Sequence, residues 1–255
     1  MASKPGFGGL RRPRASMSRM GSYYGMTHVG LVRSNNEDFY ISKPELGLYI
    51  VADGMGGAKA GELASRITVE TVVAEMERDD QPVDLAALSE AIRLANKNVR
   101  SEADRNRQNA GMGTTCVAVL VNETKAYIAN VGDSRAYLRT AGELYCVTTD
   151  HTWVNEIGRG LGLTEEQLRT HPYRNVLTKA VGAEDTVEVE THIIDFLPGD
   201  ILLLCSDGLH TVAGEEALVQ SLDQSGPLKT KCEALIEAAL EQGAPDNITA
   251  VLVEN

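Results

Sequence analysis

Three aspartates at the edges of apolar runs carry the clearest chemical signal in this sequence. Asp53 closes one apolar run and is followed by three glycines within four residues, Asp207 closes a second run, and Asp246 opens a third. A single Asp-Gly pair is usually an ordinary turn, so one occurrence carries little information. Three carboxylates at expected strand ends, far apart in the sequence, indicate convergence on one site.

The chemistry that suits these residues is the binding of hard divalent cations. Carboxylate oxygens without neighbouring His or Cys favour Mg²⁺ or Mn²⁺. Two ions about 3.5 to 4 Å apart that share Asp53 would lower the pKa of a bridging water and present hydroxide to a phosphorus atom. Arg33 would then bind two phosphate oxygens, although a lone arginine is more often a solvated surface charge.

Three further acids are candidates for the same site. Glu37 and Asp38 stand at the start of an expected strand and would act through water, and Asp133 lies in the tight turn Gly132-Asp133-Ser134-Arg135. Clustered acids without cations repel one another. Either metal ions lie among these acids, or the acids do not cluster.

The composition is that of a soluble, acidic protein. The chain of 255 residues, 43% hydrophobic and 24% charged, is long enough for one domain with a sizeable core. No apolar run is long enough to span a bilayer. The net charge of −12 becomes −17 when the five basic residues among the first 26 are set aside. Such an acidic body argues against nucleic-acid binding, and it would repel a phosphorylated substrate unless metal ions inverted the local field.

The first 24 residues differ from the rest, because they are rich in Gly, Ser, Arg and Met and show no periodicity. We expect residues 1–24 to form a flexible basic tail and residues 25–255 to form a single domain. No apolar core follows the basic residues, as a signal peptide would require. The cysteines are scattered, so we expect reduced core residues of a cytoplasmic protein. They are Cys116, Cys146, Cys205 and Cys232.

The elements that must position the acids follow from hydrophobic periodicity. Strands in antiparallel runs, with paired helices between them, favour an α+β sandwich. The polar, less regular segment 150–181, with short helices near 152–158 and 164–171, would cover or border a site. The expected long helices are 58–76, 84–104, 214–222 and 227–242. The expected strands are 25–33, 39–42, 46–52, 114–121, 125–131, 134–139, 144–148, 187–194, 201–205 and 247–253.

Six motifs follow one another along the chain: Arg33-Ser-Asn-Asn-Glu37-Asp38, Val51-Ala52-Asp53-Gly54-Met55-Gly56-Gly57, Gly113-Thr114-Thr115, Gly132-Asp133-Ser134-Arg135, Ser206-Asp207-Gly208-Leu209 and Asp246-Asn247-Ile248-Thr249. The ordered set resembles the metal-dependent protein phosphatase family of the protein phosphatase 2C type, in its bacterial form. The resemblance covers about residues 25–253. Six motifs in the family's order are far more specific than any one of them.

The resemblance implies an α+β fold in α-β-β-α layers, in which two antiparallel β-sheets pack as a central sandwich and are flanked by helix pairs. It also implies a dimetal centre at one edge of the sandwich. By analogy, Asp53 bridges two Mn²⁺ or Mg²⁺ ions and the Gly54 carbonyl joins one of them. Asp207 and Asp246 hold the other ion.

The remaining motif residues receive roles by the same analogy. Glu37 and Asp38 act through bound waters, and Asp133 helps to hold a third, weaker metal ion. Arg33 positions the phosphate. The implied reaction is hydrolysis of phosphoserine or phosphothreonine in proteins by direct attack of a metal-bridging water, without a phosphoenzyme.

The resemblance further implies partners and a place for specificity. The partners are phosphoproteins and a bacterial Ser/Thr kinase whose action the enzyme opposes, and we expect a monomer. The segment 150–181 matches the family's variable flap, which influences substrate choice.

One departure concerns the proton for the leaving group. Eukaryotic relatives carry a histidine after the Asp-Gly pair, proposed as the general acid, whereas this chain has Met55, as bacterial relatives usually do. The proton must then come from a metal-bound water or another group. No motif places a histidine, and a structural role is the better interpretation for each, with His151 as the candidate exception. The five are His28, His151, His171, His192 and His210.

Two other functions stay open. A catalytically silent module with this fold would bind a phosphoprotein, but such a module is expected to lose metal ligands, and every matched acid is present here. A metal-dependent esterase would act on small phosphates. A comparison of Mn²⁺-dependent hydrolysis of p-nitrophenyl phosphate with that of a phosphothreonine peptide separates all three.

Overall fold

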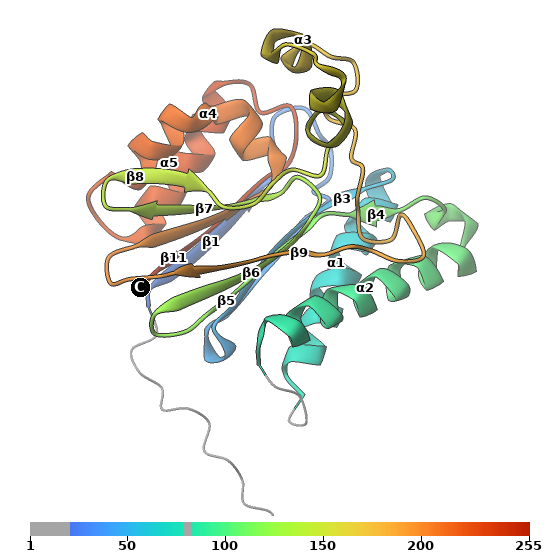
Figure 1. Cartoon of the computed structure of the whole chain (residues 1–255), viewed down its shortest axis with the longest axis horizontal. Helices are drawn as coiled ribbons and strands as arrows, with labels where there is room; N and C mark the ends of the chain where they lie inside the picture. The colour runs from blue at the N-terminus through green and yellow to red at the C-terminus, as the bar shows by residue number, and fades with distance from the viewer. Residues whose placement is uncertain (1–20, 79–82) are drawn as a thin grey trace, which may run out of the picture.

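Two antiparallel β-sheets face each other across a layer of apolar side chains (Figure 1). The computed structural model describes residues 21–78 and 83–255. One sheet has the strand order β1-β11-β10-β7-β8, and the other has the order β2-β3-β5-β6-β9, with β4 paired to β3. The strands are β1 (Tyr23–His28), β2 (Asp38–Lys43), β3 (Leu48–Met55), β4 (Gly113–Thr114), β5 (Cys116–Val121), β6 (Lys125–Val131), β7 (Arg135–Thr140), β8 (Glu143–Cys146), β9 (Glu190–Asp195), β10 (Ile201–Cys205) and β11 (Ile248–Glu254).

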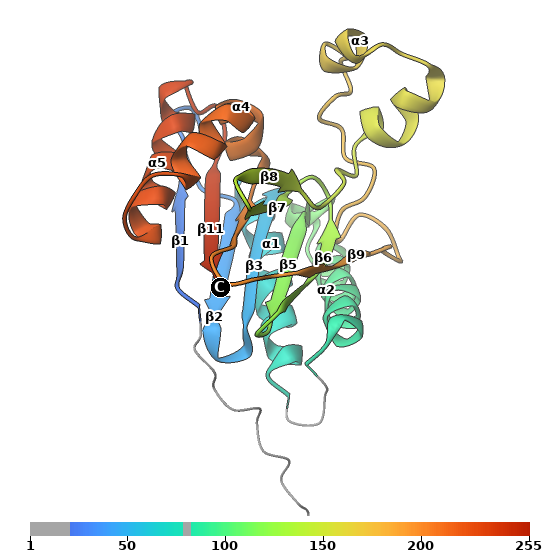
Figure 2. The ribbon, with the colours of Figure 1, turned by 60° about the vertical axis from the view of Figure 1, so that its left-hand side comes forward.

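Each sheet is covered on its outer face by a pair of helices (Figure 2). The helices α1 (Ala58–Met76) and α2 (Leu85–Arg105) pack on the sheet that contains β3. The helices α4 (Asp207–Leu222) and α5 (Leu228–Glu241) pack on the sheet that contains β10. The expected α+β sandwich with α-β-β-α layers is therefore confirmed.

The strand β10 shows why this sequence forms a central strand. All five of its residues are buried, because both faces of the sheet are covered. Leu203 and Cys205 belong to the core under α4 and α5, whereas Leu202 and Leu204 belong to the core between the sheets. Alternate side chains of a strand point to opposite faces, so a continuous apolar run serves two cores at once.

The helix α2 begins and packs as its sequence indicates. The side chain of Asp84 accepts a hydrogen bond from the Ala87 N–H at 2.8 Å and so caps the helix. Leu88, Ile92 and Val99 share one buried face. The observed bounds differ by one residue from the expected helix 84–104.

Several element boundaries were predicted wrongly. The strand β3 continues through Asp53 to Met55 instead of ending at residue 52, and β9 begins at Glu190 instead of residue 187. Two other elements differ more. The first strand runs over Tyr23–His28 instead of 25–33, because the chain turns at Gly30, which has φ of +81°. The helix α4 begins at Asp207, seven residues before the expected start at Gly214. Gly214 has φ of +76° and kinks the helix, so the apolar pattern changes face there.

The expected flexible tail falls mostly outside the described residues. The structure does not describe residues 1–20 and 79–82, and β1 begins at Tyr23, inside the expected tail. All four cysteines are free thiols. Three of them are buried as expected, but Cys146 is exposed at the end of β8, which corrects its assignment to the core.

The segment 150–181 projects from one end of the sandwich (Figures 1 and 2). It contains a π-helical turn (Val154–Gly158) and the short helix α3 (Glu165–Arg169). At its base, Trp153 N–H donates to the Val176 carbonyl at 2.8 Å, and the Trp153 ring stacks on His171 at 4.3 Å. We call this segment the flap.

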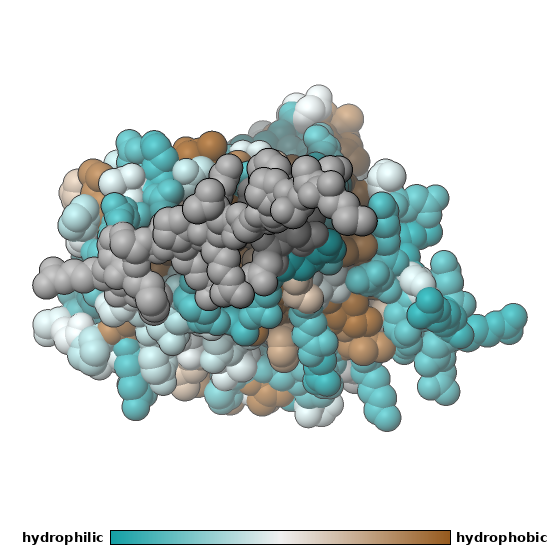
Figure 3. Space-filling view, turned by 90° about the horizontal axis from the view of Figure 1, so that it is seen from below, coloured by the Kyte–Doolittle hydropathy of each residue, from teal (hydrophilic) through white to brown (hydrophobic). Residues whose placement is uncertain are grey.

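The visible part of the face opposite the flap is mostly hydrophilic (Figure 3). Apolar residues appear there in small groups between polar ones. Among the helices of residues 21–78 and 83–255, none combines the length and the apolar composition of a transmembrane segment.

Replacing Leu204 with Ala tests the core between the sheets. The change is expected to lower the free energy of unfolding by about 2–5 kcal/mol, because it opens a cavity at a fully buried position. Leu197→Ala removes the same atoms from a side chain that is 52% exposed, and it should cost roughly 0.5 kcal/mol or less. Urea unfolding measures both variants. Equal costs would contradict the proposed packing.

Candidate metal and active site

The structure brings the three aspartates singled out in the sequence to one cavity. Asp53, Asp207 and Asp246 line a cavity of about 570 Å³. Asp53 comes from β3 in one sheet, whereas Asp207 follows β10 and Asp246 precedes β11 in the other sheet. The cavity therefore spans the ends of both sheets. Its wall also contains the candidate residues Arg33, Glu37, Gly54 and Asp133, together with Met55.

Hydrogen bonds hold both the backbone N–H and the backbone carbonyl of Asp53. Its N–H donates to Thr115 Oγ1 at 2.9 Å, and its carbonyl accepts from the Thr115 N–H at 2.9 Å and from Thr114 Oγ1 at 2.8 Å. In the strand register, Asp53 lies directly opposite Asp38 on β2. Directly opposed residues of an antiparallel pair point to the same face of the sheet, so these two carboxylates approach each other.

Asp38 is buried beside the cavity and is 6% exposed. Its Oδ2 accepts hydrogen bonds from Ser206 Oγ at 2.8 Å and from Thr249 Oγ1 at 2.6 Å. Its Oδ1 has no hydrogen-bond partner among the described residues. Because an unpaired buried carboxylate oxygen is costly, this oxygen has capacity for a bound water or ion.

Burial and mutual repulsion raise the pKa values of four of the acids. Burial is the largest cause for each, and neighbouring carboxylates add to it. The pKa is raised to about 7 for Asp38 and to about 8 for Asp133, and it is raised well above its ordinary value for Asp53. The pKa of Asp207 is raised as well. The acids therefore do cluster, and a cation among them would relieve their repulsion.

Gly54 fits this site because a side chain has no room there. A Cβ at Gly54 would collide with the carbonyl oxygens of Gly61 on α1 and of Glu37. The Gly54 N–H donates to that same Glu37 carbonyl at 3.1 Å. Two positions further, Gly56 has φ of +118°, which favours glycine. The glycines of this motif thus let the end of β3 pack against α1 and the chain that carries Glu37.

Arg33 lies at the cavity wall and pairs with one of the three aspartates. Its Nη2 donates to Asp246 Oδ2 at 2.8 Å, and this hydrogen bond raises the pKa of the guanidinium. The two side chains are 49% and 37% exposed. An ion pair this exposed contributes about 0–1 kcal/mol, so Arg33 can exchange Asp246 for another anion at little cost.

Asp133 sits in a turn between β6 and β7 that is fixed on three sides. The Gly132 N–H donates to His151 Nδ1 at 3.0 Å, and Ser134 Oγ lies 2.7 Å from Thr115 Oγ1, in the chain segment that supports Asp53. His210 Nε2 lies 2.9 Å from the Asp133 carbonyl oxygen. These contacts hold the Asp133 carboxyl group in the wall of the cavity.

The donor set fits a hard divalent cation, although it does not form a closed ligand shell. Within residues 21–78 and 83–255, no three His, Cys, Asp or Glu side chains are arranged as a finished metal site. Arg33 also occupies an oxygen of Asp246. Carboxylates without His or Cys in the cavity wall, together with the unpaired Oδ1 of Asp38, suit Mg²⁺ or Mn²⁺.

The five histidines all make structural contacts, as expected. His151, the candidate exception, is buried and accepts the Gly132 N–H, so it supports the Asp133 turn. In the described part of the chain, no histidine lines the 570 Å³ cavity. The other four contacts are His28 with Gly30, His171 with Trp153, His192 with Glu190, and His210 with Asp133.

Four polar residues that support the site received no role from the sequence. Thr115, Ser206 and Thr249 hold Asp53 or Asp38 as described above, and Asn247 clamps the loop that carries Arg33. Asn247 Oδ1 accepts the Glu37 N–H at 2.7 Å, and its Nδ2 donates to the carbonyls of Val29 and Asn35, each at 2.9 Å. All four lie within the six sequence motifs, and that position was the signal that could have identified them.

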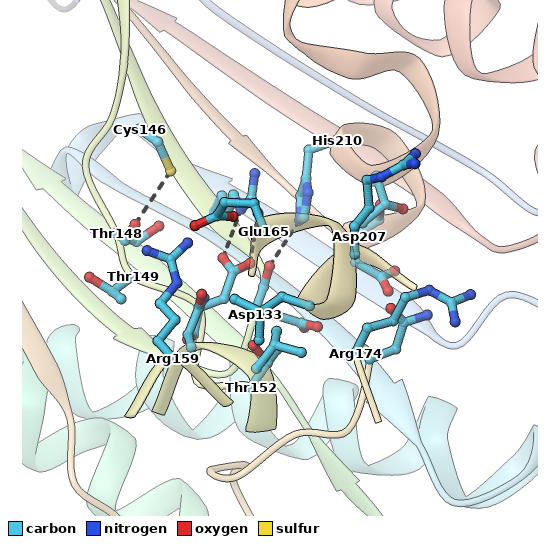
Figure 4. Close-up of a pocket in the computed structure, with 18 of the residues that line it drawn as sticks. Asp133, Cys146, Thr148, Thr149, Thr152, Arg159, Glu165, Arg174, Asp207 and His210 are labelled. Atoms are coloured by element: carbon cyan, nitrogen blue, oxygen red, sulfur yellow. Dashed lines mark hydrogen bonds and ion pairs between the residues drawn. The ribbon is translucent and has the colours of Figure 1, made fainter. Parts of the chain in front are cut away.

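A second cavity, of about 750 Å³, lies beneath the flap (Figure 4). It shares Asp133, Asn175 and Asp207 with the first cavity, so the two meet at the acids. The flap therefore borders the candidate site, as its sequence indicated.

Comparisons with known proteins agree with this geometry. The family model of protein phosphatase 2C matches residues 29–253. A serine/threonine phosphatase Stp of Listeria innocua is 36% identical over 236 residues, which cover 89% of this chain and 93% of that protein. The crystal structure of the serine/threonine phosphatase Stp1 from Staphylococcus aureus has a TM-score of 0.86 and 32% identity, and the match covers 93% of this chain and 96% of that chain.

A third match contains metal. The crystal structure of the catalytic domain of the serine/threonine protein phosphatase PstP, in complex with two manganese ions, has a TM-score of 0.81 and 34% identity. The match covers 91% of this chain and 97% of that chain. The chain therefore belongs to the protein phosphatase 2C family. The predicted family and the predicted enzyme class, a metal-dependent serine/threonine protein phosphatase, are confirmed.

Replacing Asn247 with Ala tests the clamp on the Arg33 loop. The change is expected to lower the free energy of unfolding by roughly 2–4 kcal/mol, because it removes the partner of the buried Glu37 N–H and of the part-buried carbonyls of Val29 and Asn35. The control Asn98→Ala removes an exposed hydrogen bond to Thr71 and should cost about 0.5 kcal/mol or less. Urea unfolding compares them, and an Asn247→Ala protein as stable as the control would rule out the clamp.

Proposed function

We propose that this chain hydrolyses phosphoserine and phosphothreonine esters in proteins with Mn²⁺ or Mg²⁺ bound in the 570 Å³ cavity. The observation that carries the proposal is the meeting of Asp53, Asp207 and Asp246 in one cavity with Arg33 at its wall. The similarity to the manganese complex of PstP supports it. Bound ions would supply a hydroxide nucleophile and neutralise charge on the phosphoryl oxygens.

The proposed ligands follow from the position of each group. Asp53 would serve two ions, and the Gly54 carbonyl would join one of them. Asp207 and Asp246 would hold the other ion. Asp246 becomes available when Arg33 releases its Oδ2, which the low cost of their exposed ion pair allows.

The acids around this centre would act less directly. Glu37 and Asp38 would bind through water, and the unpaired Oδ1 of Asp38 is the atom suited to that contact. Asp133 would help to hold a third ion, since its turn is fixed beside the shared wall of both cavities.

Arg33 would bind and orient the phosphate. Its guanidinium already binds a carboxylate oxygen at the cavity wall, so a phosphate oxygen can take that place. Because no histidine of the described chain lines this cavity and Met55 follows the Asp-Gly pair, the proton for the leaving alkoxide would come from water or from another group.

We also propose the biological setting that the family resemblance implies. Residues 25–255, together with the start of β1 at Tyr23, would form a single phosphatase catalytic domain that works as a monomer in the cytoplasm and opposes a Ser/Thr kinase. The four free thiols fit a reducing compartment. The apolar core between the sheets shares strands with each of the two outer cores, which fits a single domain.

Asp53→Asn tests the metal centre. We expect kcat with Mn²⁺ to fall by more than about 100-fold, because even residues that only support metal ligands contribute roughly 10–100-fold. MnCl₂ should raise the Tm of the wild type more than that of the variant. Asp185→Asn, at a side chain 90% exposed, is the matched control. Near-normal turnover by Asp53→Asn would refute the assignment.

The substrates in this experiment separate the alternatives. Wild-type protein should hydrolyse both p-nitrophenyl phosphate and a phosphothreonine peptide, each only with added Mn²⁺ or Mg²⁺. Hydrolysis of the small ester alone would indicate an esterase for small phosphates. Hydrolysis of neither would indicate a silent binding module.

Arg33→Ala tests phosphate positioning. We expect the variant mainly to raise KM, by about tenfold, since it removes charge-assisted hydrogen bonds to bound phosphate. Arg33→Lys keeps the charge but loses the planar fork, so its KM should lie between those of the wild type and Arg33→Ala. Steady-state kinetics on the phosphothreonine peptide measure both. An unchanged KM with a lowered kcat would count against this role.

A further inference from the structure

The cavity beneath the flap extends the candidate active site. Its volume is about 750 Å³, and it shares Asp133, Asn175 and Asp207 with the site cavity. A polypeptide whose phosphorylated residue occupies the site cavity therefore has room to continue beneath the flap. The residues that line this space would meet the neighbours of the phosphorylated residue.

Two arginines of the flap line this cavity without a counter-charge. Arg159 and Arg174 are exposed, and neither has an ion pair or a side-chain hydrogen bond with another described residue. Arg169, which lines the same cavity, is instead bound to Glu166 through both its Nε and its Nη2, at 3.2 and 3.0 Å. Of the four arginines in the wall, Arg135 and Arg169 are thus already paired, and the other two are available to a ligand.

Apart from the acids of the candidate metal site, the other charges in the wall neutralise no more than one of these two arginines. Arg135 and Asp150 bind each other through two hydrogen bonds of 2.7 Å each. Glu165 is a flap acid without an ion pair in the described chain, and it offsets one of the two arginines. Apart from Asp133 and Asp207, which belong to the candidate metal site, the wall of this cavity carries four arginines and three acids, so one positive charge is left over.

The two arginines lie on different sides of the cavity (Figure 4). Arg174 is on the side of Asp207, and Arg159 is on the opposite side, near Thr149. Arg174 immediately precedes Asn175, which lines both cavities, so Arg174 adjoins the place where they meet.

We propose that Arg159 and Arg174 form an anion-binding subsite that selects substrates with a second negative group close to the phosphorylated residue. The group is an acidic side chain or a second phosphate on the same polypeptide. This inference rests on the proposed phosphatase function. Without these arginines, the acidic body of the protein would disfavour such substrates, so the two arginines counter the preference that net charge alone would set.

Three phosphothreonine peptides test the subsite. They differ only beside the phosphothreonine, where they carry glutamines, glutamates or one phosphoserine. For wild-type protein with Mn²⁺, kcat/KM for each charged peptide should exceed that for the neutral peptide by about tenfold, since each exposed charge pair contributes up to roughly fivefold. Raising the salt concentration should reduce this ratio. The glutamate and phosphoserine peptides distinguish the two sources of the anion.

Variants test which residues cause the preference for charged over neutral peptides. Arg159→Ala and Arg174→Ala should each lower the ratio of kcat/KM for charged over neutral peptides by about threefold, and the double variant should bring it to about 1 or below. Arg169→Ala is the matched control, and it should keep the wild-type ratio because Glu166 occupies that guanidinium. Glu165→Gln should raise the ratio. A wild-type ratio near 1, or a ratio unchanged in the double variant, would overturn the proposal.

A binding measurement separates this proposal from the proposed function. Trp153 is the single tryptophan of the chain and stacks on His171 at the base of the flap, so its fluorescence reports peptide binding there. The phosphoserine-containing peptide should bind metal-free wild type more tightly than the neutral peptide does, and the double variant should lose this difference. If no peptide is hydrolysed, the phosphatase assignment fails, and this binding difference still decides for or against the subsite.

Discussion

The cost of placing several carboxylates together in a poorly solvated cavity governs the rest of this structure. Burial and neighbouring charges raise the pKa values of Asp38, Asp53, Asp133 and Asp207. Such a cluster is unfavourable by itself, and it becomes favourable when divalent cations lie among the acids. Ser206 and Thr249 donate hydrogen bonds to Asp38, and the Asp53 N–H donates to Thr115 Oγ1. These bonds hold the acids in position against that repulsion.

The packing of the two sheets brings these acids together. Asp38 and Asp53 come from neighbouring strands of one sheet, whereas Asp207 and Asp246 adjoin β10 and β11 of the other. Their separation therefore depends on how the two sheets pack, and the apolar layer between the sheets fixes that packing. A change in this layer would alter the separation of the acids, even though none of its described residues lines the site cavity.

The flap differs from the sandwich in how it is held. The sandwich is fixed by three apolar cores. The flap is held together at its base by the stack of Trp153 on His171, and polar contacts of His151 with Gly132 and of Asp150 with Arg135 join it to the sandwich. A segment with few buried contacts can change its surface residues at little cost to the fold. This arrangement keeps the metal-binding acids on rigid elements and places the charges that meet the rest of a substrate on an adaptable one.

The sequence by itself determined the elements with strong periodicity and the identity of the acids. The bounds of α1, β6 and β10 agree with the expected ones, because a continuous apolar pattern defines each of them. The aspartates stood out because Asp beside Gly or Asn at strand ends recurs in an order that resembles one family. Residue type and order along the chain were sufficient for both.

Only the tertiary structure decided which groups meet. The pair of Arg33 with Asp246 joins residues 213 positions apart, and the clamp of Asn247 on Glu37 joins residues 210 apart. No local pattern encodes such contacts, because they depend on the packing of one sheet against the other. The same holds for the exposure of Cys146 and for the free guanidinium groups of Arg159 and Arg174. Charge can be read from a sequence, but whether a charge is neutralised depends on which side chains lie within a few ångströms of it.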